Sequence, residues 1–225
     1  MGKTILQTRQ RLLQAALDLF REKGYAASAM AEILKRAQAN SGSFYYFFRS
    51  KEDLLMAVLE RYREILYPAL LAPIWKTTSD PIERIFRLMA KYRELLVASK
   101  CTYGCPIGRL ALEIDPAQKR IHRKIAENFD GWADAVEQCL KEAQSQGRMP
   151  PHINRKRLAT LILSVMEGGV MQSRSQRSVE PFDLGVEELW QYIDLLAAQS
   201  QGEDSPSSKS KSRRPKWRKP IGQSS

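Results

Sequence analysis

Apolar residues recur every three or four positions over most of the chain, which is the spacing of one face of an α-helix. The first such stretch spans residues 5–23, and its apolar face consists of Ile5, Leu6, Leu12, Leu13, Ala16, Leu17 and Phe20. The same periodicity predicts helices over residues 28–37, 41–47, 50–66, 81–98, 105–114, 117–146, 154–177 and 184–199. The sequence has no hairpin signals and no runs that alternate with a period of two. We therefore predict an all-α fold.

Residues that begin and end helices support the first of these boundaries. Gly24 follows the first helix in the position of a C-terminal cap, and Ser28 is placed to cap the second helix. Asn40 offers a cap to the short third helix. Ser50, with Asp53 three residues later, resembles a capping box at the start of the fourth helix.

Prolines and one glycine predict where the later helices stop. Pro68 is expected to end the fourth helix because proline lacks the N–H group that continues the hydrogen-bond ladder. Residues 73–81, rich in Pro and Thr, then form a connection. Gly147 and the Pro150-Pro151 pair separate two of the long helices near the C-terminus.

Residues 28–47 (SAMAEILKRAQANSGSFYYF) are typical of a helix, a turn and a second short helix. The second helix begins with small polar residues, so it can lie deep in the major groove of DNA without steric conflict. Tyr45 and Tyr46 add hydroxyls that can reach phosphates or bases, and Lys51 can share a phosphate with the next helix N-terminus. The candidate DNA-binding residues are Ser28, Asn40, Ser41, Gly42, Ser43, Tyr45, Tyr46 and Lys51. The neighbouring phenylalanines are expected in the core: Phe44, Phe47 and Phe48.

The net charge of +11 is concentrated at the two ends of the chain. Residues 1–63 carry 11 Lys and Arg against 6 Asp and Glu, and residues 200–225 carry 7 against 2. Basic ends suit a surface that binds phosphates, although a solvated charged surface would have the same composition. Residues 200–225 are rich in Ser, Pro, Lys and Arg and poor in apolar residues, so we expect a disordered basic tail. That tail either contacts nucleic acid nonspecifically or only aids solubility.

Between residues 8 and 60 the chain resembles the DNA-binding domain of the TetR/AcrR family of bacterial transcriptional regulators. The matching features include Phe20, the Gly24-Tyr25 turn, Gly42, Tyr45 and the Ser50-Lys51 pair. The resemblance implies a helix-turn-helix domain over residues 1–50 and a helical dimerisation and ligand-binding domain over residues 51–199. It also implies binding to double-stranded operator DNA, a homodimer and a small-molecule inducer.

Two positions depart from the pattern of that family. The turn between the two DNA-binding helices commonly carries Gly-Val, where this chain has Gln38-Ala39. Glycine suits a positive φ, so either Gln38 adopts that strained conformation or the turn has a different geometry. Ala29 stands where the family usually has Thr, which removes one possible phosphate contact.

Two later segments, YGCPIGRLALE (103–113) and EGGVMQSRSQ (167–176), resemble one group of TetR-type regulators more loosely. By that analogy the last two helices, 154–177 and 184–199, form a four-helix dimer interface. Gly168-Gly169 would permit close helix approach. The expected interface residues are Leu158, Ile162, Val165, Gly169, Trp190 and Ile193. The alternative is that 154–177 is a helix of the internal core.

A ligand cavity in the C-terminal part is expected among aromatic and sulfur-containing side chains, which could equally be plain core. Its candidate residues are Tyr103, Cys105, Phe129, Trp132 and Met166, and Tyr92 could line it as well. The cysteines Cys101, Cys105 and Cys139 could sense redox state or electrophiles, or could be inert buried residues. The inducer is therefore either a small molecule or a thiol-reactive compound.

Other classes of protein fit the sequence less well. Three cysteines suit a reduced cytoplasm, no run of apolar residues is long enough to span a bilayer, and two histidines are too few for a zinc site. No nucleophile elbow, phosphate-binding loop or carboxylate pair indicates an enzyme, and we expect no cofactor and no metal. The function predicted is that of a sequence-specific DNA-binding repressor in the cytoplasm. The alternative is a helical scaffold that binds protein partners and no specific DNA.

Overall fold

The computed structural model describes residues 2–200, which form helices and short connections with no strand among them. The helices are α1 (Gly2–Lys23), α2 (Met30–Ala37), α3 (Ser41–Phe47), α4 (Lys51–Arg61), the π-helical turn η1 (Tyr62–Leu66), α5 (Tyr67–Thr77), α6 (Pro81–Ala98), α7 (Pro106–Glu113), α8 (Lys119–Ser145), α9 (Arg155–Gln176) and α10 (Glu180–Gln199). Every predicted helix is present, so the all-α fold is confirmed. The predicted basic tail, beyond Ser200, lies outside the described residues.

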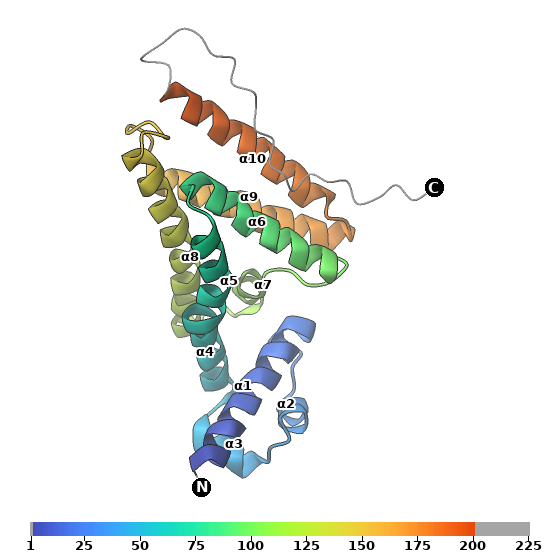
Figure 1. The fold of residues 1–225 in the computed structure, drawn as a ribbon. Helices are drawn as coiled ribbons and strands as arrows, with labels where there is room; N and C mark the ends of the chain where they lie inside the picture. The colour runs from blue at the N-terminus through green and yellow to red at the C-terminus, as the bar shows by residue number, and fades with distance from the viewer. Residues whose placement is uncertain (1, 201–225) are drawn as a thin grey trace.

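The first three helices form one end of the molecule, with α4 leading away from them (Figure 1). Leu12 and Ala16 of α1 are fully buried, as are Ile33 of α2 and Phe44 of α3. Asn40 caps α3 as predicted, because its side chain accepts a hydrogen bond from the Ser43 N–H at 2.8 Å. This small apolar core holds α3 at a fixed angle to α1 and α2.

Ser28 does not cap α2, and that prediction is wrong. The cap is Ala29, whose N–H donates to the Glu32 carboxylate at 3.4 Å. Ser28 has no exposed surface, and its hydroxyl donates to the main-chain carbonyl of Gly24 at 2.6 Å. Because that hydroxyl already stabilises the turn between α1 and α2, Ser28 also leaves the set of DNA-binding candidates.

The fourth helix does not end at Pro68, and that prediction is also wrong. The N–H of Tyr67 bonds to the carbonyl of Tyr62, which closes a wider π turn, and α5 then continues to Thr77. The π turn shifts the hydrogen-bond register. Pro68 then lies in the first turn of α5, where a missing N–H costs little. As a result α4 and α5 run end to end alongside α8 (Figure 1), and the predicted connection shortens to residues 78–80.

The remaining helices form the other end of the molecule, where α6, α9 and α10 pack beside one another (Figure 1). Arg93 of α6 forms a two-point ion pair with Asp183 of α10, at 2.7 and 2.8 Å. The rings of Phe86 and Trp190 join the same two helices, with their centroids 4.4 Å apart. One cluster of buried apolar side chains extends from Leu12 of α1 to Leu196 of α10. The two ends of the molecule therefore share a continuous core. None of the described helices has the length and apolar character needed to cross a membrane.

Candidate DNA interface and ligand cavity

The turn between α2 and α3 settles the conformation of Gln38. This residue has φ 50° and ψ 49°, so it adopts the left-handed conformation that glycine usually supplies. The Gln38 and Ala39 N–H groups then bond back to the carbonyls of Lys35 and Leu34, which closes the end of α2. The turn thus has the geometry that a glycine would favour, at the cost of some backbone strain.

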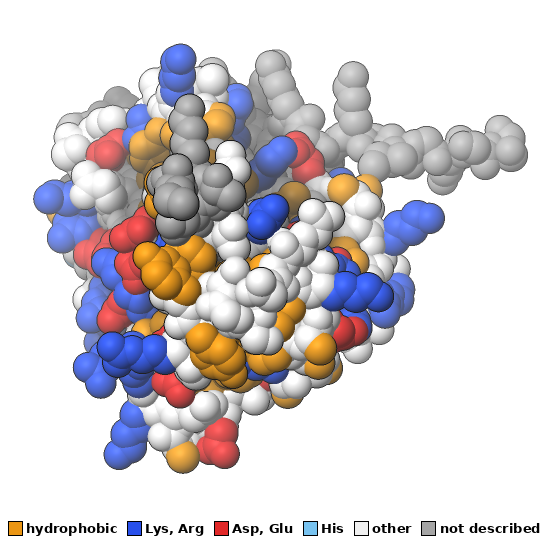
Figure 2. All heavy atoms as spheres, turned by 90° about the horizontal axis from the view of Figure 1, so that it is seen from below, with side chains coloured by type: hydrophobic (Ala, Val, Ile, Leu, Met, Phe, Trp, Pro, Cys, Tyr) orange, Lys and Arg blue, Asp and Glu red, His pale blue; other side chains and the backbone are white. Residues whose placement is uncertain are grey.

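The outward face of α3 is uncharged and rich in hydrogen-bonding groups. Tyr45 is 66% exposed and Tyr46 is 73% exposed, although both are large aromatic residues. Ser41 and Gly42 are exposed at the start of the helix, whereas Phe44 is buried beneath it. Figure 2 views this end of the molecule and shows uncharged and hydrophobic-class side chains in the middle, with Lys and Arg gathered towards the edges. An uncharged reading surface between cations suits a base-reading helix flanked by phosphate contacts.

Lys51 lies beside the turn between α1 and α2 and is not a free surface cation. Its ammonium donates to the carbonyl of Tyr25 at 2.6 Å and lies 4.4 Å from the centre of the Tyr25 ring. Burial lowers the pKa of Lys51, and the Glu113 carboxylate partly opposes this. Its contact with a phosphate stays a prediction, and the structure adds a second role in holding the turn.

Arg109 of α7 joins the C-terminal part of the chain to the end of α1. Its guanidinium donates to the main-chain carbonyls of Lys23 at 2.5 Å and Arg21 at 3.3 Å. These carbonyls belong to the last turn of α1, where no N–H of the helix is available to donate to them. The negative end of the helix dipole at this position also favours a nearby cation. Arg109 also pairs with Glu113 at 2.5 Å.

Glu113 completes this junction from the other side. Its carboxylate accepts a hydrogen bond from the main-chain N–H of Tyr25 at 2.7 Å. Gly24 lies between Lys23 and Tyr25 in the sequence and has φ +92°. A Cβ at this position would overlap the Glu113 carboxylate. Arg109, Glu113 and the last turn of α1 are hereafter called the α1–α7 junction. The sequence did not predict this junction, since neither charged residue follows a motif that signals such a contact.

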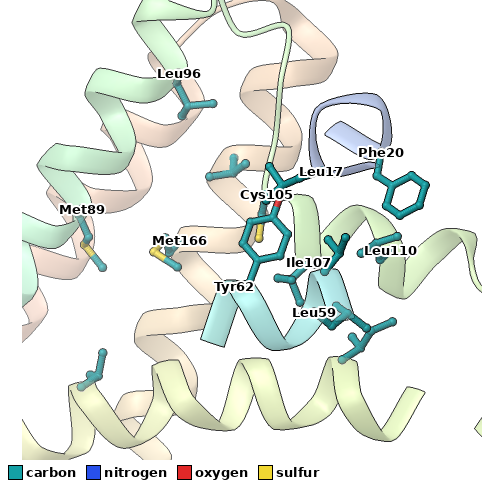
Figure 3. Close-up of a cluster of buried hydrophobic side chains, with 14 of the residues drawn as sticks. Leu17, Phe20, Leu59, Tyr62, Met89, Leu96, Cys105, Ile107, Leu110 and Met166 are labelled. Atoms are coloured by element: carbon teal, nitrogen blue, oxygen red, sulfur yellow. The ribbon is translucent and has the colours of Figure 1, made fainter. Parts of the chain in front are cut away.

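A cavity of about 340 Å³ opens between α1, α5 and α6, and we call it the tyrosine cavity. Its apolar wall includes Leu17, Leu66, Leu70, Leu95, Leu96 and Val170. Its polar wall includes Arg21, Tyr62, Tyr67, Tyr92, Tyr103 and Cys105. Figure 3 shows Leu17 of α1 and Tyr62 beside Cys105, so the DNA-binding end contributes directly to the wall.

The predicted ligand residues divide into three groups. Tyr103 and Cys105 line the tyrosine cavity, and Phe129 lines a neighbouring cavity of about 280 Å³ that also contains Cys105. Trp132 and Met166, at 3% and 2% exposed, line neither cavity. Trp132 is core because Tyr67 and Tyr92 cover it, with ring centroids 4.6 and 5.7 Å away.

Cys105 lies between the two cavities and caps α7, since its sulfur accepts the Gly108 N–H at 3.4 Å. Burial, and then the nearby Glu167 carboxylate, raise the pKa of Cys105 well above the ordinary range of a thiol. Burial also raises the pKa of Glu167. A Cβ on Gly108 would lie 2.7 Å from a Glu167 oxygen, so a larger residue at this position would displace the Glu167 carboxylate. Glu167 is the one acidic residue in the otherwise mostly apolar stretch 158–171. The sequence did not predict that it lies beside Cys105.

Most of the predicted dimer-interface residues belong to the interior of a single chain. Leu158, Ile162 and Ile193 are 5%, 1% and 1% exposed, so they pack within this chain. Gly169 is buried too, because a Cβ there would lie 3.1 Å from Phe182 of α10. These four assignments are wrong: the close helix approach predicted from glycine occurs between α9 and α10 of one chain. Val165 and Trp190 are half-buried.

A different set of apolar residues is exposed on the same two helices. Leu184, Tyr192 and Leu195 of α10 are 57%, 45% and 66% exposed, at spacings that place them on one helix face. Leu161 of the adjoining α9 is 42% exposed. We call these four residues the α9–α10 face.

Comparisons with known proteins agree with this architecture. Residues 12–58 match the family model for bacterial regulatory proteins of the tetR family, and residues 81–189 match the tetracyclin repressor-like C-terminal domain. The chain is 26% identical over 175 residues to the HTH-type transcriptional repressor DhaR of Mycobacterium sp. (strain GP1), covering 78% of this chain and 86% of DhaR. It is 28% identical over 179 residues to the HTH-type transcriptional regulator LmrA of Bacillus subtilis, covering 77% and 90%.

Solved structures have the same fold. A regulatory protein TetR from Rhodobacter sphaeroides superposes with a TM-score of 0.73 at 25% identity, over 80% of this chain and 95% of that one. The reduced form of Escherichia coli NemR superposes with a TM-score of 0.71 at 23% identity, over 84% and 96%. The two matching family models together span well over half of the sequence. The chain therefore belongs to the TetR family of bacterial transcriptional regulators.

Proposed function

We propose that this protein is a transcriptional repressor that binds a specific operator as a homodimer through α3. A small molecule in the tyrosine cavity releases it. The observation that carries the proposal is the exposure of Tyr45 and Tyr46 on a helix whose opposite side is anchored by buried Phe44. These two adjacent tyrosines form an exposed aromatic patch, and contact with DNA would cover it. Family membership favours this regulator over the helical scaffold, and we propose no catalytic role.

The α9–α10 face is the surface through which we propose that two copies associate. Its exposed leucines and Tyr192 would otherwise remain in water, and association would bury them. A helix pair from each copy gives the four-helix interface that the sequence predicts. Two copies related by a two-fold axis would place their α3 helices about 34–36 Å apart on DNA, one helical turn.

Two connections can carry a change in the cavity to α3. One is the continuous rod of α4, η1 and α5, which supplies Tyr62 and Tyr67 to the cavity. The other is the α1–α7 junction, since Cys105 caps α7 and Arg109 on the same helix holds the end of α1. A ligand releases the operator only if it binds the released arrangement more tightly, typically by about 1–3 kcal/mol.

The inducer we propose is a reversibly bound small molecule and not a thiol-reactive compound. The thiolate is the reactive form of cysteine, and burial with the Glu167 carboxylate disfavours it at Cys105 by raising the pKa. Burial raises the pKa of Cys101 and Cys139 as well. A cavity of about 340 Å³ falls within the ~300–1,000 Å³ typical of sites for small ligands.

A mobility-shift assay with the DNA upstream of the protein's own gene tests the proposal. The expected result is a complex that survives excess scrambled DNA of the same composition and is abolished by unlabelled upstream DNA. The double variant Tyr45→Ala, Tyr46→Ala should lose this complex. Leu112→Ala, which truncates an 80%-exposed leucine on α7, should keep it. Equal competition by scrambled DNA would contradict specific operator binding and favour the scaffold.

A further inference from the structure

Of the residues in range 2–200 that line the tyrosine cavity, Arg21 is the single charged one, and it lies at the exposed rim on α1. None of the residues that line this cavity within the described part of the chain is an Asp or Glu. Among the described residues no carboxylate lies within ion-pair distance of the Arg21 guanidinium, which instead lies 5.0 Å from the centre of the Tyr103 ring. The rim therefore offers a cation that a ligand can pair with.

The interior of the cavity has the opposite character. Burial raises the pKa of Tyr92 and of Tyr67 well above the ordinary range, so both hydroxyls are neutral and the surroundings disfavour a negative charge. The Tyr67 hydroxyl is buried beside the Trp132 indole, and among the described residues it makes no hydrogen bond of ordinary geometry. Buried apolar side chains such as Leu17 and Leu96 complete these walls. This region suits an uncharged, mainly apolar group, and an aromatic ring would extend the existing ring contacts.

We propose that the tyrosine cavity binds a small organic acid, with its carboxylate on Arg21 at the rim and its apolar body among Tyr62, Tyr67 and Tyr92. In this arrangement the carboxylate of the ligand lies at the solvent-exposed rim and its apolar part lies in the buried interior of the cavity. The free-energy cost of burying an unpaired anion is therefore avoided. Arginine and carboxylate form strong, two-point hydrogen bonds. The inference rests on the proposed function, because it gives the chemical class of the inducer.

Such a ligand would contact the DNA-binding end of the molecule directly. Its carboxylate would compete with the Tyr103 ring for the Arg21 guanidinium. The main-chain carbonyl of Arg21 is already held by Arg109 in the α1–α7 junction, at 3.3 Å. Movement of Arg21 would therefore act on the last turn of α1, without passing through the rest of the C-terminal helices.

Isothermal titration of the full chain with matched compounds tests the proposal. The acids are benzoate, phenylacetate, 3-phenylpropionate and 4-phenylbutyrate, and each is compared with its primary amide, which keeps the shape and removes the charge. We expect at least one acid to bind once per chain and at least tenfold more tightly than its amide. Acetate, which lacks the apolar body, should not bind.

Arg21→Met keeps an unbranched apolar stem and removes the charged guanidinium, so it should abolish the preference for acid over amide. The matched control is Arg9→Met on the same helix, whose guanidinium lies 5.7 Å from the Phe48 ring, at the other end of α1. That variant should keep the preference. The proposal is overturned if no acid binds below 1 mM, if the amides bind equally well, or if the preference survives Arg21→Met. Operator binding without ligand is measured separately, so these failures are distinct from a failure of the repressor itself.

Discussion

Arg109 of α7 donates a hydrogen bond to the main-chain carbonyl of Lys23 at 2.5 Å, across 86 residues of sequence. This contact ties the last turn of α1 to the helix whose first residues adjoin the tyrosine cavity. Cys105, the cap of α7, lines that cavity. A shift of α7 by a bound molecule must therefore either move α1 or break this hydrogen bond.

Removing the guanidinium of Arg109 should loosen the connection between the two ends of the molecule. Arg109→Met leaves the carbonyls at the end of α1 without that donor, and hydrogen bonds to charged groups contribute about 1.5–3 kcal/mol. We expect a loss of that order in the free energy of unfolding, measured by urea denaturation, together with weaker operator binding. The control Arg87→Met removes an exposed ion pair between two residues of α6, Arg87 and Glu83. It should lower the free energy of unfolding by less than about 0.5 kcal/mol. Equal effects of the two variants on stability and operator binding would contradict the proposed role of the α1–α7 junction in connecting the two ends of the molecule.

We assign the Tyr45 hydroxyl to a phosphate contact and the Ser43 hydroxyl to a base contact. These two kinds of contact should be separable by their effects on different DNA sequences. Tyr45→Phe removes only the hydroxyl and keeps the ring that packs on Phe44. We expect it to weaken binding two- to tenfold on every sequence, as a lost phosphate contact does. Ser43→Ala should instead change the order of preference among operator variants, since base contacts contribute about 1–3 kcal/mol of discrimination. Fluorescence anisotropy against a set of single-base variants measures both. A sequence-dependent loss from Tyr45→Phe would reverse this assignment.

Association should depend on the α9–α10 face and not on the residues first predicted for it. Leu195→Glu places a charge on this face and should convert a dimer to a monomer, as measured by light scattering after gel filtration. Leu112→Glu makes the same change at an exposed leucine of α7 and should leave the dimer intact. A dimer that persists in Leu195→Glu would place the interface elsewhere.

The buried thiols should react slowly at neutral pH. The raised pKa of Cys105 keeps the thiol protonated at pH 7, so its reaction with a disulfide reagent should accelerate only as the pH rises towards that pKa. Burial raises the pKa of Cys139 to about 11, with the same consequence. Glu167→Gln removes a carboxylate that opposes the Cys105 thiolate, so it should lower this pKa and speed the reaction at Cys105 alone. Glu94→Gln, at an exposed acid on α6, is the control. Rapid labelling of Cys105 in the unaltered protein at pH 7 would contradict this prediction and support a thiol-reactive inducer.

Much of the fold was predictable because local patterns specify it. The apolar spacing predicts α6 to the residue, and the Asn40 cap sets the start of α3. The error at Pro68 arose because a sequence rule for an ideal α-helix does not anticipate a π turn. Such a turn depends on how Tyr62 and Tyr67 pack in three dimensions.

The site was less predictable because its contacts join distant segments. Tyr103 and Cys105 line the tyrosine cavity, whereas Trp132, predicted beside them, is core. Ligand binding by Tyr103 and Cys105 stays a prediction. Hydrophobic periodicity shows that a face of α9 is buried, yet it does not distinguish burial by α10 of the same chain from burial by a second copy. Arg109 and Glu113 look like an ordinary pair of charges four residues apart, and only the fold brings the end of α1 to them.

Footprinting on the upstream DNA with hydroxyl radicals tests the central claim most directly. Two α3 helices in a two-fold dimer should protect two short segments of backbone whose centres lie about one helical turn apart. Both segments should lose protection together in the Tyr45→Ala, Tyr46→Ala variant, while Leu112→Ala should reproduce the original pattern. Protection that is diffuse, or that stays unchanged when both tyrosines are removed, would contradict specific binding through α3.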